Sequence, residues 1–217
     1  MLPTNPKQII IVDDHPAIIK GLTFAFESEW PECAITSFQS GSKAIEAYPS
    51  LNPDVVLLDY QMPDQSGYIT AMKLLKIEPT AKILLFTFLD SLPIAGNFLA
   101  IGGRGFVTKD ADLDTLFAAI TTIIQGDYYF HSRHERELSK MLHHGISNKF
   151  PKIQFSTREL QVCLKLSRGL SVKMIAHELD LSVRTVESYK ESMIVKTGVK
   201  STIELIDFIY QNGIKQI

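Results

Sequence analysis

Residues 8–13 read QIIIVD and residues 54–59 read DVVLLD, and these two stretches decide the fold. Each is a continuous apolar run of strand length, without alternation of polar and apolar side chains. Strands of this kind are buried on both faces, as in a parallel sheet that helices cover on both sides. A third run, KILLFTF at residues 82–88, has the same character. We therefore expect a sheet whose central strands are parallel.

Outward from these runs, strand and helix patterns alternate over residues 1–128. The first run is followed by a helical period over residues 16–29, with Trp30 expected near the surface at its end. Five strands alternating with five helices predict an α/β fold, a doubly wound five-stranded parallel sheet of the flavodoxin-like kind. The other strands are predicted at residues 33–38 and 105–109, and the other helices at residues 42–48, 66–78, 92–101 and 112–125.

The pattern changes after residue 128. Residues 129–154 are predicted to be a linker that is partly helical, over residues 132–143. Residues 155–217 contain only helical patterns, which predicts a second, small all-α domain. Its four helices are expected at residues 157–167, 172–179, 183–196 and 202–211.

Charge divides the chain in the same way. Residues 1–128 carry 8 basic and 15 acidic side chains, a net −7, whereas residues 150–217 carry 10 and 7, a net +3. This asymmetry favours an anion-binding C-terminal domain, although it is mild. No apolar run reaches the roughly 18–20 residues of a membrane span, so we expect a cytoplasmic protein without a membrane partner. The two isolated cysteines fit no metal spacing and are expected to be buried.

Polar residues stand where the predicted strands end. Asp13 and Asp14 end the first strand, Asp59 the third and Lys109 the fifth, and Thr87 lies near the end of the fourth. In open parallel sheets this edge binds ligands. Converging carboxylates repel one another and require a cation, and oxygen ligands of this kind suit Mg²⁺. One carboxylate can then attack a phosphoryl donor, while a lysine and a hydroxyl bind the phosphoryl oxygens.

The stretches IIIVDDHP, VVLLDYQMPDQSG, LLFT and GGRGFVTKD resemble the motifs of response-regulator receiver domains. The resemblance covers residues 7–126. It implies that Asp59 is the phosphoacceptor. It also implies a Mg²⁺ site formed by Asp13, Asp14, Asp59 and the backbone carbonyl of Gln61.

The same resemblance assigns the residues around the phosphoryl group. Thr87 is implied to be the switch hydroxyl, Lys109 the lysine that pairs with the phosphate, and Phe106 the aromatic switch residue. Two positions depart from the family. Phe88 stands where a small residue is usual, and its ring could hinder entry of the phosphodonor or slow hydrolysis. Asp110 replaces the proline of many receivers.

The C-terminal segment has the marks of a helix-turn-helix. Ser156 and Glu159 have the spacing of a capping box, and Ser182 is placed to cap a helix after a turn of about three residues. Periodicity alone also permits a helical bundle that binds protein.

The residues favour DNA, because TRE (157–159), GLS (169–171), IA (175–176) and GV (198–199) resemble LuxR- and NarL-type DNA-binding domains. The resemblance implies that the helix over residues 183–196 enters the major groove, with Val186, Tyr189 and Met193 facing the core. The predicted DNA and phosphate contacts are Lys173, Arg184, Thr185, Glu187, Ser188, Lys190, Glu191, Lys196 and Lys200.

Two of these predicted contacts are acidic. Glu187 stands where the family usually has lysine, and Tyr189 where histidine is common. Near DNA phosphates, the negative charges of Glu187 and Glu191 lower the affinity for DNA. Their carboxylates can instead accept hydrogen bonds from cytosine N4, which would make them specificity determinants.

Together these features predict a phosphorylation-controlled transcription regulator of the NarL/FixJ type. The expected partners are a sensor histidine kinase, half-sites in double-stranded DNA and a second copy in a homodimer formed on phosphorylation. It is not expected to be an enzyme beyond self-phosphorylation and self-dephosphorylation at Asp59. One alternative is an adaptor whose helices bind protein, which salt-dependent duplex binding would exclude. Another alternative is a metal-dependent phosphatase that uses the aspartate pocket. The sequence offers no second catalytic acid or base for that reaction.

Overall fold

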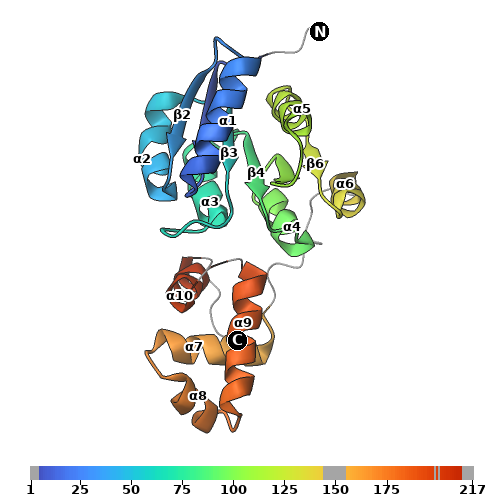
Figure 1. The fold of residues 1–217 in the computed structure, drawn as a ribbon. Coiled ribbons are helices and arrows are strands. Elements are labelled where there is room, and N and C mark those ends of the chain that lie inside the picture. The colour runs from blue at the N-terminus through green and yellow to red at the C-terminus, as the bar shows by residue number, and fades with distance from the viewer. Residues whose placement is uncertain (1–4, 144–154, 198, 200, 212–217) are drawn as a thin grey trace. The chain divides into compact units, whose positions relative to one another are not determined.

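A parallel sheet of six strands, in the order β2-β1-β3-β4-β5-β6, forms the first part of the computed structural model (Figure 1). The structure describes residues 5–143, 155–197, 199 and 201–211, and the chain divides into two compact units, Met1–Phe150 and Pro151–Ile217. The strands are β1 (Gln8–Val12), β2 (Ala34–Phe38), β3 (Val55–Leu58), β4 (Ile83–Thr87), β5 (Gly105–Thr108) and β6 (Tyr129–His131).

The central strands are buried on both faces, which confirms the predicted α/β fold. Every residue of β3, β4 and β5 is buried. Ile9, Ile11 and Leu57 belong to one core with residues of α1 and α5, so these helices cover one face of the sheet. The alternate residues point to the other face. The helices of this unit are α1 (Pro16–Glu29), α2 (Gly41–Leu51), α3 (Gly67–Ile77), α4 (Leu92–Ala100), α5 (Leu113–Ile124) and α6 (Glu135–His143).

The prediction of five strands was wrong, because the segment predicted as linker begins with β6. This strand pairs parallel with β5, placing Phe130 opposite Phe106. The following helix, α6, contacts α4 and β6, and its Leu138 is fully buried. Three residues are too few to show a strand period in sequence, so only the helical half of this segment was predicted.

Trp30 is 5% exposed, so its expected place near the surface was wrong. Its ring centroid lies 5.7 Å from that of Phe26 and 5.2 Å from that of Phe117. Phe117 comes from α5, and this contact could not be read from α1 alone.

The second unit is helical, as predicted. Its helices are α7 (Thr157–Ser167), α8 (Val172–Glu178), α9 (Val183–Thr197) and α10 (Thr202–Gln211). The capping box of Ser156 and Glu159 at the start of α7 is confirmed. Within the described residues of both units, no helix is long and apolar enough to cross a membrane.

Candidate functional site

The carboxyl ends of β1 and β3 bring acidic residues together. Asp13 follows the last residue of β1 and Asp59 the last residue of β3. The strands are parallel neighbours, and the Asp59 backbone N–H donates to the Val12 carbonyl at 2.8 Å. Both aspartates therefore lie at one edge of the sheet, where they are 2% and 4% exposed. Asp14 lies beside them and is partly exposed.

Lys109 provides the positive charge of this pocket. Its Nζ lies 2.6 Å from Asp13 Oδ2 and 2.9 Å from Asp59 Oδ2, and its side chain is buried. Its backbone N–H donates to the Thr87 carbonyl at 3.0 Å, which fixes the lysine beyond the end of β5. One buried ammonium shared by two buried carboxylates leaves negative charge uncompensated.

Burial raises the pKa of the Asp59 carboxyl above its ordinary value, although Lys109 acts against this rise. The charge of Asp13 raises the pKa further, and a hydrogen bond from the Gln61 backbone lowers it. A bound cation would favour the ionised carboxylate. The donor set fits Mg²⁺, because carboxylate oxygens are the ligands that this hard cation prefers.

His15, which directly follows Asp13 and Asp14 in the sequence, is a fourth member of this cluster. Asp13, Asp14, His15 and Asp59 each bring a ligand atom within 4.8 Å of the others. The Nδ1 of His15 lies 3.1 Å from Asp13 Oδ1 and 3.0 Å from Asp14 Oδ1. Its place directly after two acidic residues was the only signal in the sequence.

The residues predicted around the phosphoryl group lie at the ends of β4 and β5. Thr87 is 1% exposed, and its Oγ1 accepts from the Leu89 backbone N–H at 3.4 Å. Phe106 is fully buried within β5. Phe88, in contrast, is 65% exposed, and its ring centroid lies 5.4 Å from Lys109 Nζ. The ring thus borders the lysine from outside the pocket.

The loop after Asp59 is fixed at both ends. At Gly67 a Cβ atom would lie 2.1 Å from the Asp59 carbonyl oxygen, so only glycine permits this close approach. Asp64 accepts hydrogen bonds from Ser40 Oγ and from the Ser42 backbone and side chain at 2.8–2.9 Å. These bonds tie the loop to the start of α2. Gln61, whose carbonyl was predicted as a ligand, lies in this loop between Asp59 and Asp64.

In the second unit, α8 and α9 form a helix-turn-helix. Asp180 in the turn adopts a left-handed conformation with φ of 53°. Ser182 caps α9, accepting from the Thr185 backbone N–H at 3.0 Å. Val186 and Met193 are fully buried, and Tyr189 is partly buried, so these residues lie toward the core.

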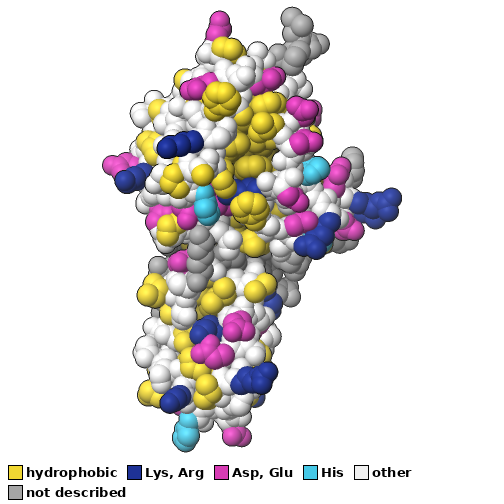
Figure 2. All heavy atoms as spheres, viewed as in Figure 1, with side chains coloured by type: hydrophobic (Ala, Val, Ile, Leu, Met, Phe, Trp, Pro, Cys, Tyr) yellow, Lys and Arg dark blue, Asp and Glu magenta, His cyan; other side chains and the backbone are white. Residues whose placement is uncertain are grey.

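The opposite side of α9 carries charges of both signs. Arg184, Ser188 and Glu191 are exposed. Glu187 forms an ion pair with Lys190 one turn along the same helix. On the face that Figure 2 shows, basic and acidic side chains are interspersed over this unit. Of the other predicted contacts, Lys173 is exposed and Thr185 partly buried, whereas Lys200 lies outside the described residues.

Lys196 has a partner within the protein. Its Nζ lies 2.7 Å from both carboxylate oxygens of Glu159, and Ser192 Oγ donates to the same carboxylate at 2.7 Å. Burial would raise the pKa of Glu159, but these hydrogen bonds and one from the Ser156 backbone outweigh it and hold the pKa below its ordinary value. Lys196 thereby joins α9 to the start of α7.

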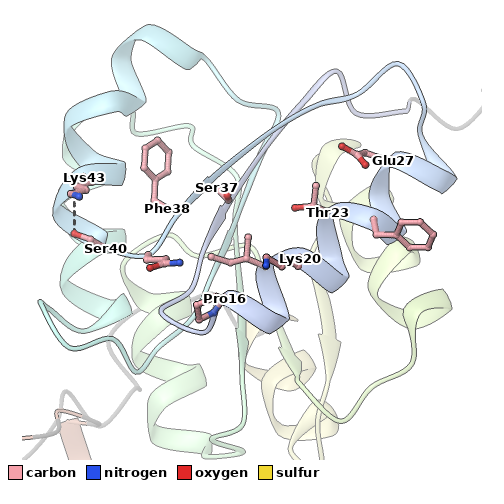
Figure 3. A pocket seen from close by; sticks show the side chains of 11 residues that line it. Pro16, Lys20, Thr23, Glu27, Ser37, Phe38, Ser40 and Lys43 are labelled. Atoms are coloured by element: carbon pink, nitrogen blue, oxygen red, sulfur yellow. Dashed lines mark hydrogen bonds between the residues drawn. The ribbon is translucent and has the colours of Figure 1, made fainter.

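A groove of about 830 Å³ lies at the β2 edge of the first unit. Its walls are α1 and the segment that runs from β2 into α2 (Figure 3). Phe38, Lys20 and Lys43 line it, but none of the predicted site residues does.

Two family models match the chain. Residues 9–121 match the response regulator receiver domain, and residues 154–209 match the bacterial regulatory proteins of the luxR family.

Several relatives match this chain over nearly their whole length. The transcriptional regulatory protein YdfI of Bacillus subtilis is 29% identical over 212 residues, which covers 97% of this chain and 98% of that protein. The oxygen regulatory protein NreC of Staphylococcus aureus is 29% identical over 207 residues, 93% of this chain and 95% of that protein. A solved complex of the two-component response regulator RcsB with DNA has a TM-score of 0.59 and 25% identity, covering 95% of this chain and 98% of that one.

Proposed function

We propose that this chain, which belongs to the NarL/FixJ-type response regulators of two-component systems, is switched by phosphoryl transfer to Asp59. The chain is a transcription regulator with a receiver and a LuxR-type DNA-binding domain. The observation that carries the proposal is the pair of contacts from Lys109 Nζ to Asp13 and Asp59, at 2.6 and 2.9 Å, inside a buried acidic pocket. We place the receiver at residues 1–128 and the DNA-binding domain at residues 155–217.

Asp59 is the proposed nucleophile. A carboxylate oxygen attacks the phosphorus of a phosphohistidine on a sensor kinase, or of acetyl phosphate. A P–O bond to Asp59 forms, and the donor's P–N or P–O bond breaks with its electrons leaving on the donor. Lys109 then pairs with the phosphoryl oxygens. Thr87 Oγ1 accepts from Leu89, so its own proton is available to a phosphoryl oxygen.

Asp13, Asp14, Asp59 and the carbonyl of Gln61 are the proposed Mg²⁺ ligands. When bound, the cation supplies positive charge that lowers the repulsion between the carboxylates and the incoming phosphoryl group. Phe106, fully buried within β5, is the proposed aromatic switch. Beyond self-phosphorylation and self-dephosphorylation at Asp59, we propose no turnover.

Phosphorylation with acetyl phosphate and Mg²⁺ tests this assignment, with intact-mass measurement as the readout. Asp59→Asn is expected to abolish uptake of the phosphoryl group. Asp54→Asn is the matched control, because Asp54 lies at the other end of β3 and its side chain accepts, in the described contacts, only from the backbone N–H groups of Lys7 and Gln8. Equal uptake by Asp59→Asn and the wild type would overturn the assignment.

The second half of the proposal is that α9 lies in the major groove of promoter half-sites, bound by a homodimer that phosphorylation favours. RcsB, which this chain resembles, is bound to DNA in a solved complex. Exposed Arg184, Ser188 and Glu191 are the proposed base-reading side chains, and Lys173 and Lys190 contact phosphates. Lys196, in contrast, is proposed to position α9 through Glu159.

Charge reversal at Glu187 tests the placement of α9. Glu187→Lys should raise duplex affinity by about tenfold at low salt, steepen the salt dependence by about one to two phosphate contacts and change the preferred sequence. Glu178→Lys on α8 makes the same charge change as a control. If the two variants behave alike in affinity and sequence preference, α9 does not lie in the groove.

A further inference from the structure

Arg133 binds the loop that follows β4, next to the phosphorylation pocket. The loop between β4 and α4, residues 88–91, is called the switch loop below. Arg133 Nη2 donates to the Asp90 carbonyl at 2.8 Å, and Nε lies 3.1 Å from Asp90 Oδ2. The Arg133 backbone N–H donates to the same carboxylate at 3.3 Å. One residue thus makes three contacts with one residue of the switch loop.

The contacts of Arg133 are part of a larger docking, made by residues 129–143, the docked segment. β6 extends the sheet beside β5, with Phe130 opposite Phe106. Thr108 Oγ1 donates to the His131 carbonyl at 3.5 Å. Further along, Leu138 of α6 is fully buried. The docked segment is therefore packed on the receiver rather than only tethered to it.

The docked segment also explains why α4 is apolar. Residues 94–99 of α4 are all buried, although α4 has only one side toward the sheet. A helix that is apolar all round needs cover on its outer side, and α6 contacts α4. Undocking of α6 would expose apolar surface of α4 to water, which favours the docked state.

Thr87 precedes the four-residue switch loop, and Arg133 contacts Asp90, the third residue of that loop. Asp90 stands three residues after Thr87, whose hydroxyl is proposed to bind the phosphoryl group. If Thr87 moves toward that group, the switch loop moves with it, because Leu89 is bonded to Thr87 Oγ1. The Asp90 carbonyl and carboxylate, which Arg133 holds, then change position.

We propose that Arg133 is a positioning residue that holds the switch loop in its unphosphorylated geometry, so that phosphorylation of Asp59 loosens the docked segment. This inference rests on the proposed function of Asp59. The segment continues toward residues 155–217, so its release changes the tether of the DNA-binding unit. Because the Arg133 side chain is 70% exposed, its ion pair is weak, and we expect effects of about three- to fivefold. Coupling is reciprocal, so removing Arg133 should favour the phosphorylated geometry by the same factor.

Hydrogen exchange of the full chain with Mg²⁺, with and without beryllofluoride as the phosphoryl mimic, tests the proposal. In the wild type, amides of residues 129–143 should exchange about three- to fivefold faster with beryllofluoride. In Arg133→Gln the amides of residues 129–143 should already exchange at the faster rate in the absence of beryllofluoride. The beryllofluoride concentration for half-saturation should fall by about the same factor of three to five. Arg136→Gln, an exposed arginine on α6, should behave as the wild type.

Protection around Asp59 serves as the internal reference. If beryllofluoride protects that region but leaves exchange of residues 129–143 unchanged, the proposal is wrong. It is also wrong if Arg133→Gln binds beryllofluoride no more tightly than Arg136→Gln. Absence of protection around Asp59 itself would instead contradict the proposed function of the pocket.

Discussion

Two nearly buried carboxylates, one in each unit, have opposite environments. Asp59 is 4% exposed and Glu159 is 3% exposed, and each is paired with a lysine. Glu159 accepts from Lys196, Ser192 and the Ser156 backbone, so its lone pairs are satisfied. Asp59 shares Lys109 with Asp13.

The pKa values follow this difference. Hydrogen bonds overcome burial and lower the pKa of Glu159, whereas burial dominates and raises the pKa of Asp59. A satisfied carboxylate holds helices together, and an incompletely compensated one is available to a cation and a phosphoryl group. Burial alone thus does not identify a functional acid; the balance of its partners does.

Neutral substitutions should separate the two carboxylates most clearly. Glu159→Gln removes the negative charge that pairs with Lys196. It should lower the free energy of unfolding of the second unit by about 2–3 kcal/mol. This is a small loss for a broken buried ion pair, because Lys196 is partly exposed. Asp59→Asn should change the stability of the first unit by about 1 kcal/mol or less, because Lys109 keeps Asp13. Denaturant unfolding measures each unit, followed by amide exchange in α7 and α9 for the second unit and by the fluorescence of Trp30, just after α1, for the first. If Asp59→Asn loses more stability than Glu159→Gln, the proposed difference between the two carboxylates is wrong.

Gly67 packs directly against the backbone of Asp59. In Gly67→Ala the new Cβ would lie 2.1 Å from the Asp59 carbonyl, so the backbone must shift. A shift of about 1 Å in a reacting group costs up to about 100-fold in rate, and we expect phosphorylation by acetyl phosphate to slow by about 10- to 100-fold. The control is Gly21→Ala in α1, where nothing lies within 4 Å of the added Cβ. Equal rates in the two variants would mean that Asp59 does not depend on this contact.

Acid should affect the two carboxylates in opposite directions. The stability that Glu159 contributes is present above its ordinary pKa of about 4.3 and is lost as pH falls through its lowered pKa in the fold. Asp59 has a raised pKa, so its contribution is full below its ordinary pKa of about 3.9 and is lost as pH rises through the raised value. The stability gap between the wild type and Glu159→Gln should therefore narrow in acid. Any advantage of Asp59→Asn over the wild type should appear only toward neutral pH, in the same unfolding measurements.

The smallest effect is expected at the pocket mouth. Phe88 is exposed, and its ring borders Lys109 at 5.4 Å. Phe88→Ala should speed both phosphorylation and hydrolysis by about two- to fivefold, since the contact is worth on the order of 0.5–1 kcal/mol at an exposed site. Leu113→Ala, an exposed apolar residue on α5, serves as control. A slower reaction in Phe88→Ala would mean that the ring positions Lys109 rather than restricts entry.

The parallel sheet and the pocket could be predicted because both depend on local patterns. Strands buried on both faces are uniformly apolar, and Asp13, Asp59 and Lys109 stand at their ends. The capping box of Ser156 and Glu159 was equally readable. The sheet topology then brings these local signals to one edge.

Contacts between distant segments could not be read in this way. β6 has three residues and no period, so its pairing with β5 was missed. The ion pair of Lys196 with Glu159 was not predicted, because nothing in the sequence places the Glu159 carboxylate beside α9. Trp30 was expected near the surface because Phe117 lies far away in the chain. The contacts of His15 with Asp13 and Asp14 are likewise evident only from the structure.

Control of DNA binding by the Asp59 pocket is tested most directly by the affinity of the full chain for a promoter duplex, measured with and without beryllofluoride and Mg²⁺, alongside its assembly state by sizing. We expect tighter, salt-dependent binding and a shift toward dimer with the mimic, and neither change in Asp59→Asn. Unchanged affinity and unchanged assembly in the wild type would contradict control of DNA binding by the Asp59 pocket.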